Sequence, residues 1–297
     1  MNSVLTVLFV ALGALALMFL VVWVIEARKS RETPDPGAPD PERVGLGFVT
    51  NFFDALGIGS FATTTTYFRF RKLVRDELIP GTLNVGHCLP TITQAFIGIA
   101  VIKVDVLTLV LMIATAVAGA WFGAGVVSRM PRRAIQIGMG IALLLAAGFM
   151  FAKVTNLMPS NEAGSLDLKG VPLVLGLVGS FFLGSIMPLG IGYYAPCMVL
   201  VAVLGMNPRA AFPIMYGACA FLMPVAGVQF VRKERYSLRA AAGLTVGGVF
   251  GAALALLVVK ELPLYYVMWL VTVVVIYTGI SLLRTAAREK KVGAPVA

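Results

Sequence analysis

Few side chains in this chain could do chemistry, and the clearest group is a run of hydroxyls directly after a glycine pair. The Gly-Ile-Gly of residues 57–59 is followed by Ser60 and then by four consecutive threonines, residues 63–66. Glycines break a helix, and the freed N–H groups at the start of the next helix bind anions without a basic side chain. We therefore predict that this run contacts a ligand, with Ser60, Thr63 and Thr64 closest to the break. The alternative for each threonine is a hydrogen bond to a carbonyl of its own helix.

A second glycine break repeats the first. Leu-Gly-Ile-Gly occurs at residues 56–59 and again at residues 189–192, and a Gly-x-Cys follows each copy, at residues 86–88 and 217–219. Matching breaks at corresponding places predict an internal duplication. In membrane transporters built from such repeats, substrate binds where the broken helices of the two halves meet.

Polar groups also follow the second break. Tyr193, Tyr194 and Cys197 come directly after it. We predict that they complete the ligand site together with Gly190 and Gly192.

The three cysteines, Cys88, Cys197 and Cys219, all lie in apolar stretches. Such a set does not form a disulfide framework. Each is either a small core residue or a contact for a sulfur-bearing anion, and the sequence leaves both interpretations open.

Two ionisable residues lie deep in apolar stretches, where such groups are costly and are candidates for function. His87 is the single histidine, and Asn84 shares a helical face with it. Asp54 is the one charged residue of the stretch at residues 44–68. We predict that Asp54 or His87 carries a coupling proton; the alternative for both is a neutral, hydrogen-bonded structural role. No second histidine or carboxylate pair is spaced to join His87, so no metal is expected.

The composition predicts a membrane protein without a soluble domain. The chain is 59% hydrophobic and 13% charged, with a mean hydropathy of +0.91, whereas a soluble domain carries about twice that charged share. Its net charge of +10 comes from basic residues in short loops, as orientation signals do, so nucleic acid is not an expected partner. About 20 apolar residues cross a bilayer, and the charge-free runs cover residues 1–25, 78–102, 106–128, 134–152, 170–208, 210–231, 240–259 and 262–283.

Basic clusters predict the topology, because lysine and arginine collect on the cytoplasmic side. One cluster lies at residues 28–31 and the next at residues 69–75. They cannot both be cytoplasmic if residues 44–68 cross once. The sequence therefore predicts a re-entrant hairpin that enters, breaks at residues 57–59 and leaves on the same side. Residues 1–25 lack a basic start and are predicted to be a retained helix rather than a signal peptide.

The charge-free run at residues 170–208 predicts a second hairpin. Its 39 residues would form a helix about 58 Å long, roughly twice the membrane core. We therefore expect it to enter from the opposite side and to break near residues 188–192. Three crossings follow each hairpin, so the two units have opposite orientations.

These elements predict an all-α polytopic membrane protein. Its plan is an inverted-topology repeat, in which a re-entrant or broken hairpin and three transmembrane helices occur twice after one extra N-terminal helix. The alternative makes both broken segments ordinary spans. The predicted segments are an N-terminal transmembrane helix (1–27), a cytoplasmic linker (28–43), repeat 1 (44–153), an extracytoplasmic loop (154–170), repeat 2 (171–285) and a cytoplasmic tail (286–297).

With these motifs the chain resembles the TauE/SafE sulfite exporter family, also called the TSUP family, over residues 45–285. The resemblance rests on the glycine patterns and their neighbours at residues 57–60, 80–84, 190–192, 196 and 209–211. It implies transport of a sulfur-containing or organic anion such as sulfite, a sulfonate like sulfoacetate, or thiosulfate. It also implies export more often than import.

The function predicted from the sequence is a secondary transporter, not an enzyme, that binds an anion between the two hairpin tips at the membrane midplane. No cofactor is expected. The sequence leaves open an anion channel of the same fold and a thiosulfate-uptake-like protein that uses its cysteines. The predicted substrate-binding residues are Gly57, Gly59, Ser60, Thr63, Thr64, Asn84, His87, Gly190, Gly192, Tyr193, Tyr194 and Cys197.

The expected partners are the lipid bilayer, the small anionic substrate and a coupling proton, and a homodimer is compatible with the sequence. The expected location is the bacterial inner membrane. The charge distribution predicts an N-terminus outside the cell and a C-terminus in the cytoplasm.

Overall fold

The computed structural model describes residues 3–29, 35–99, 104–155, 157, 164–190, 192–207, 210–258 and 265–292. Parts of the predicted linker 28–43, loop 154–170 and tail 286–297 lie outside this range, as do Ile191 and Arg209. The elements are α1 (Ser3–Lys29), α2 (Pro41–Ala55), α3 (Ser60–Arg71), η1 (Asp76–Leu78), α4 (Ile79–Gly86), α5 (Cys88–Gly98), α6 (Val106–Val127), α7 (Arg132–Val154), α8 (Gly170–Ile186), η2 (Met187–Leu189), α9 (Tyr194–Val203), α10 (Ala211–Arg232), α11 (Leu238–Val258) and α12 (Tyr265–Val292).

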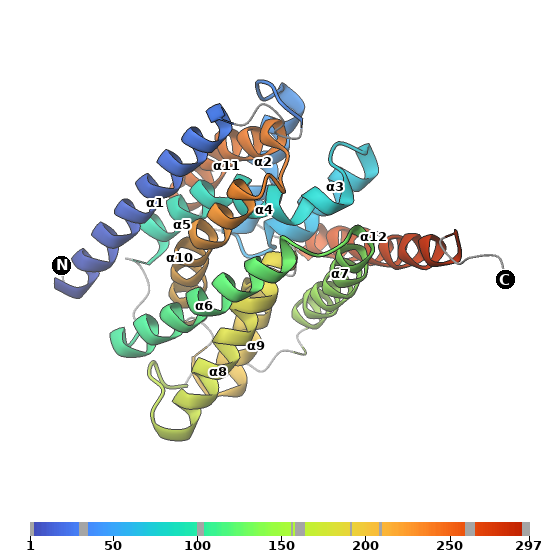
Figure 1. Ribbon diagram of the computed structural model, residues 1–297. Coiled ribbons are helices and arrows are strands. Elements are labelled where there is room, and N and C mark those ends of the chain that lie inside the picture. The colour runs from blue at the N-terminus through green and yellow to red at the C-terminus, as the bar shows by residue number, and fades with distance from the viewer. Residues whose placement is uncertain are drawn as a thin grey trace.

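The protein is an all-α polytopic membrane protein, as the composition predicts. Within the described residues, seven helices are long and apolar enough to cross a bilayer: α1, α6, α7, α8 together with η2, α10, α11 and α12. In Figure 1 the helices form one bundle, with α1 along one flank and α12 leaving at the opposite flank.

The charge-free run over residues 78–102 is a broken helix in its described part. The chain forms η1, α4 and α5 there, with a joint at His87. Pro90 explains the joint, because proline lacks the N–H that would bond to the carbonyl of Gly86 four residues earlier. The hydroxyl of Thr245 in α11 donates to that carbonyl instead, at 2.9 Å. The lost bond is thus replaced from a neighbouring helix, as a membrane interior requires.

Both predicted glycine breaks are present. The first separates α2 from α3, and the second separates η2 from α9. Gly57 and Gly59 have φ of +90° and +91°, and Gly190 and Gly192 have φ of +111° and +75°. Glycine adopts this region without the steric cost that other residues incur, so these positions end one helix and redirect the chain into the next.

Helix contacts in the bundle occur in matched pairs. The helix α2 packs along α11, and α8 packs along α6. Likewise α3 touches α12, and α9 touches α7. In addition, α7 packs on α12, and α10 packs on both α4 and α5.

Glycines bring the paired helices to backbone contact. A Cβ on Gly247 of α11 would lie 1.8 Å from the carbonyl oxygen of Val44 in α2. A Cβ on Gly123 of α6 would lie 1.9 Å from the carbonyl oxygen of Ser185 in α8. Small residues let membrane helices approach this closely, and van der Waals packing then holds them together.

The two arms of the first broken segment begin and end together. Arg71 at the end of α3 lies 2.8 Å from the carboxylate of Glu42 at the start of α2. Tyr67 of α3 donates to the same carboxylate at 2.9 Å. The hydrogen bonds from Arg71 and Tyr67 hold the pKa of Glu42 below its usual range.

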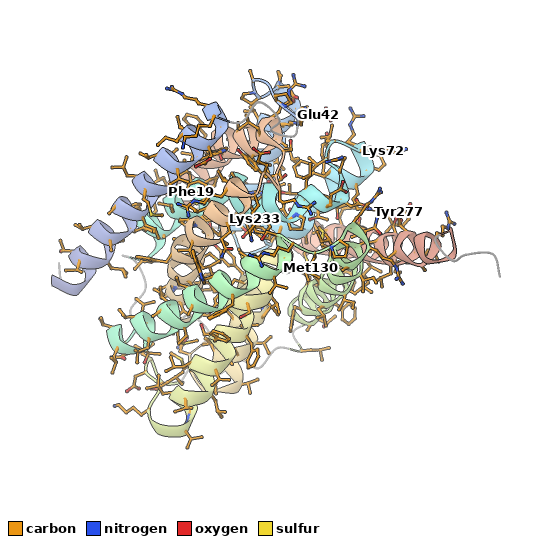
Figure 2. All side chains as sticks on the ribbon, viewed as in Figure 1. Phe19, Glu42, Lys72, Met130, Lys233 and Tyr277 are labelled. Atoms are coloured by element: carbon orange, nitrogen blue, oxygen red, sulfur yellow. The ribbon has the colours of Figure 1, made fainter. Side chains whose placement is uncertain are left out.

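Other basic side chains gather at this end of the bundle. Lys233, directly after α10, donates to the hydroxyl of Ser128, directly after α6, at 2.7 Å. Figure 2 labels Lys233, and it also labels Met130, two residues beyond Ser128. Arg69 of α3 pairs with Asp76 of η1 at 2.5 Å. Arg132, which begins α7 just after α6, lies 3.8 Å from the same Asp76 carboxylate. The ends of α3, α6 and α10 therefore share one basic end.

The second broken segment begins and ends at another place. The N–H of Asn207, after α9, donates to the carbonyl of Ser165, shortly before α8, at 2.9 Å. The N–H of Asp105, at the start of α6, donates to the carbonyl of Leu166 at 3.0 Å. Since α6 starts here and ends at the basic end, this is the opposite end of the bundle.

Candidate functional site

The two helix breaks meet at a cavity of about 60 Å³. The first break contributes Gly57, Gly59 and Ser60, and the second contributes Gly192 together with Tyr193 and Tyr194. The helices α5, α7 and α10 complete the wall. On this measure a cavity needs about 10–15 Å³ to hold one water, so the site has room for several waters or one small ion.

Asp54 supplies the charge at this cavity. Its side chain is buried, and it is the one charged residue among the described residues that line the wall. One carboxylate oxygen accepts the backbone N–H of Ser60 at 2.7 Å, and the other accepts from Nε2 of Gln94 at 2.8 Å. The carboxylate therefore lies at the N-terminus of α3, where the helix dipole favours a negative charge.

Gln94 connects the two breaks. Its Oε1 accepts a hydrogen bond from the hydroxyl of Tyr194 at 2.7 Å. A continuous path of hydrogen bonds thus runs from Ser60 through Asp54 and Gln94 to Tyr194, from the start of α3 to the start of α9. Low local dielectric strengthens such a network and makes an unpaired member costly.

Six of the predicted substrate-binding residues line the cavity, and so does Asp54. They are Gly57, Gly59, Ser60, Gly192, Tyr193 and Tyr194. The other six, Thr63, Thr64, Asn84, His87, Gly190 and Cys197, do not line it.

His87 does not face the cavity. Its ring connects α2 and α3, the two arms of the first hairpin, through hydrogen bonds. Asn51 of α2 uses its amide nitrogen to donate to the carbonyl of Gly47 at 2.8 Å, so its oxygen faces Nδ1 of His87 at 3.0 Å. The Nδ1 atom therefore carries the proton, and Nε2 accepts from the hydroxyl of Thr64 at 3.1 Å. In this neutral tautomer both ring nitrogens have a hydrogen-bond partner.

We expect His87→Leu to lower the stability of the protein, because it leaves the buried oxygen of Asn51 without its donor. The expected loss is about 1–3 kcal/mol, measured as a lower Tm of the purified protein in detergent. Thr115→Val is the matched control, because the Thr115 hydroxyl bonds only to carbonyls of its own helix α6. An equal Tm for His87→Leu and the control would contradict this connection.

Three of the remaining predicted residues lie against other parts of the protein. The Thr63 hydroxyl bonds to the carbonyls of Gly59 and Ser60 in its own helix, at 3.2 and 2.9 Å. Asn84 of α4 donates to the carbonyl of Pro188 at 3.1 Å and so attaches α4 to the second break. The side chain of Cys197 is buried.

Sequence reasoning missed the thioethers of this cavity. Met150, Met187, Met198 and Met223 line it together with Cys219. One signal was present, because Met187 stands at the position that corresponds to Asp54 in the duplicated segment. Methionines fill irregular gaps and adapt to different contents, so this wall can repack around a ligand.

Taken together, the fold and the cavity define a polytopic α-helical membrane protein with a cavity of mixed polar and apolar lining at two helix breaks. Searches with protein-family models, curated proteins and solved structures found no match to the chain.

Proposed function

We propose that this protein is a secondary transporter for a small anion, which binds in the cavity between the two helix breaks. The observation that carries the proposal is the convergence of these breaks on one cavity. Broken backbone at membrane depth is tolerated where it lines a cavity. Half-helix N-termini that point into such a cavity hold anionic groups in transporters.

The helix contacts support an inverted repeat as the framework. Under exchange of the two halves of the chain, the contact between α2 and α11 corresponds to the contact between α8 and α6. The contact between α3 and α12 likewise corresponds to the contact between α9 and α7. The first hairpin starts and ends at the basic end, where Arg71 meets Glu42. The second starts and ends at the opposite end, where Asn207 meets Ser165. Rocking of two such units around a shared site gives alternating access.

The basic end is assigned to the cytoplasm by the positive-inside rule. The helix α1 carries Arg28 and Lys29 in its last turn, so its N-terminus lies outside. Arg284 and Arg288 lie near the end of α12, so the C-terminus lies in the cytoplasm. The bacterial inner membrane is the proposed location.

The substrate class rests on the resemblance to the TauE/SafE family. It points to sulfite, thiosulfate or a sulfonate. The donors that would receive an oxyanion are the N–H and hydroxyl of Ser60 and the hydroxyl of Tyr194. The hydroxyl of Tyr193 is bonded to Ser180 at 2.6 Å instead. No basic side chain occurs among the described lining residues, so backbone and hydroxyl donors would hold the charge.

Thermal stability against a panel of anions tests this function. The panel is sulfite, thiosulfate, sulfate, sulfoacetate, methanesulfonate, taurine, lactate, phosphate and chloride, with purified protein in detergent. A ligand at 100 times its Kd adds about 2.7 kcal/mol to stability. We expect sulfur oxyanions or sulfonates to raise the Tm and the same anions to exchange across proteoliposomes. A Tm shift with lactate alone would overturn the substrate class, and no shift with any anion would overturn anion binding.

A second function is favoured by the four methionines, Cys219 and the Asp54 carboxylate of the cavity. Thioether and thiol ligands select soft monovalent cations such as Cu⁺. The same Tm measurement with silver nitrate in chloride-free buffer, using Ag⁺ as the probe, separates the two. A large shift with Ag⁺ and none with anions would favour a soft-cation transporter.

A further inference from the structure

We propose that Asp54 couples anion transport to protons because its carboxylate is a tethered anion that occupies the substrate's place at the start of α3. Substrate enters that place after Asp54 takes up a proton. This inference rests on the proposed function, since it assumes that the transported species is an anion.

The first step is the occupancy of the α3 N-terminus. Gly59 at the N-cap position has no side chain to satisfy the helix, and the carboxylate of Asp54 accepts the Ser60 N–H in its stead. The donor predicted to receive an oxyanion is therefore already in use. A second anion beside the carboxylate would also meet like-charge repulsion in a site with little water.

The second step is the response of Gln94 to a proton on Asp54. A protonated carboxyl is a donor, and it would then face the NH₂ group of Gln94, which is also a donor. Rotation of the amide turns Oε1 of Gln94 toward the new O–H and NH₂ toward the hydroxyl of Tyr194. The Tyr194 O–H loses its acceptor and is free to donate into the cavity.

The Ser60 N–H still bonds to the remaining carbonyl oxygen of the neutral carboxyl, but this bond has lost its charge assistance, so an incoming anion can replace it. One proton thus makes two donors available to the substrate. The Ser60 N–H comes from the first half of the chain and the Tyr194 O–H from the second. The proton that binds Asp54 is the only atom transferred, and no bond between heavy atoms changes. Both halves of the site respond together because the network joins them directly.

Among the residues that the structure describes, no other charged side chain faces Asp54. The described titratable side chains that face it are Tyr194 from α9 and Tyr216 and Cys219 from α10. Tyrosine and cysteine side chains are neutral at physiological pH. From α3, α5 and α7, Asp54 or its cavity meets Ser60, Gln94, Thr91, Ala146, Phe149 and Met150, and these do not titrate.

The coupling makes the protein a proton–anion symporter. For a monoanion the combined movement carries no net charge. An inward proton gradient then drives uptake, which is opposite to the export that the family resemblance implies.

Binding measured against pH in wild-type protein and Asp54→Asn tests the coupling. The probes are thiosulfate and methanesulfonate, whose charge stays constant between about pH 5.5 and pH 8. Uptake of one proton with each bound anion predicts that wild-type affinity falls about tenfold for each pH unit above the titration of Asp54. Asp54→Asn is expected to bind with one affinity at every pH, and to exchange anion without responding to an imposed pH gradient.

Two further variants keep the test decisive. Tyr194→Phe is expected to lower affinity at every pH while keeping the wild-type slope. Asp105→Asn is the matched carboxylate control, because Asp105 caps α6 and asparagine caps equally well. Should Asp54→Asn fail to fold, the wild-type slope and the uptake of one proton per bound anion still decide.

The outcomes separate this inference from the proposed function. Anion binding with the same affinity across the pH range in wild-type protein, or an unchanged slope in Asp54→Asn, overturns the coupling and leaves anion transport standing. No binding of either probe at any pH in either protein overturns both.

Discussion

Leucine in place of Gly192 or Gly59 is expected to stop anion binding in a protein that still folds. Both glycines line the cavity, and a Cβ at either would meet nothing within 4 Å, so the new side chain has open space to enter. A branched side chain in a cavity of about 60 Å³ leaves little room for an ion. The measurements are the Tm shift with the anions that bind wild-type protein and exchange in proteoliposomes.

Backbone strain must be separated from this effect. Gly59 and Gly192 have positive φ, and a non-glycine residue there costs on the order of 1–3 kcal/mol. Gly205→Leu is the matched control, because Gly205 has φ of +81° and also meets nothing within 4 Å. It follows α9 and does not line the cavity. Normal transport by both Gly59→Leu and Gly192→Leu would contradict the assignment of the anion site to this cavity.

Leucine in place of Gly47 is expected to disrupt the packing of α2 against α11. A Cβ on Gly47 would lie 2.6 Å from the backbone of Leu244, and backbone cannot move aside as a side chain can. Overpacking in a tight interface costs about 1–3 kcal/mol and sometimes more. Because α2 carries Asp54 to the cavity, we expect a strongly lowered Tm and loss of binding together.

The control for Gly47 lies in the same helix. A Cβ on Gly45 meets nothing within 4 Å, so Gly45→Leu changes helix propensity and apolar surface in the same way without the clash. We expect its Tm to stay close to that of the wild type. An equal loss of Tm in both variants would mean that α2 does not depend on this close contact.

Apolar runs and glycine spacing were sufficient to predict the class and the breaks. Membrane crossing depends on length and hydropathy, which are properties of local sequence. A helix break at Gly57 or Gly192 is also local, because it follows from the φ that glycine allows. Duplication of the Leu-Gly-Ile-Gly motif further predicted that both breaks belong to one site, and both line one cavity.

The sequence by itself therefore determined a polytopic helical protein with two glycine breaks, but only the tertiary structure decided which polar groups face the cavity. His87 and Asp54 looked equivalent as buried ionisable residues. In the folded protein His87 hydrogen-bonds to Asn51 and Thr64, whereas Asp54 accepts the N–H of Ser60 at the cavity. The physical reason is that a buried polar group bonds to the partners that neighbouring helices bring within hydrogen-bond distance. Those partners are remote in sequence, so the sequence does not identify them.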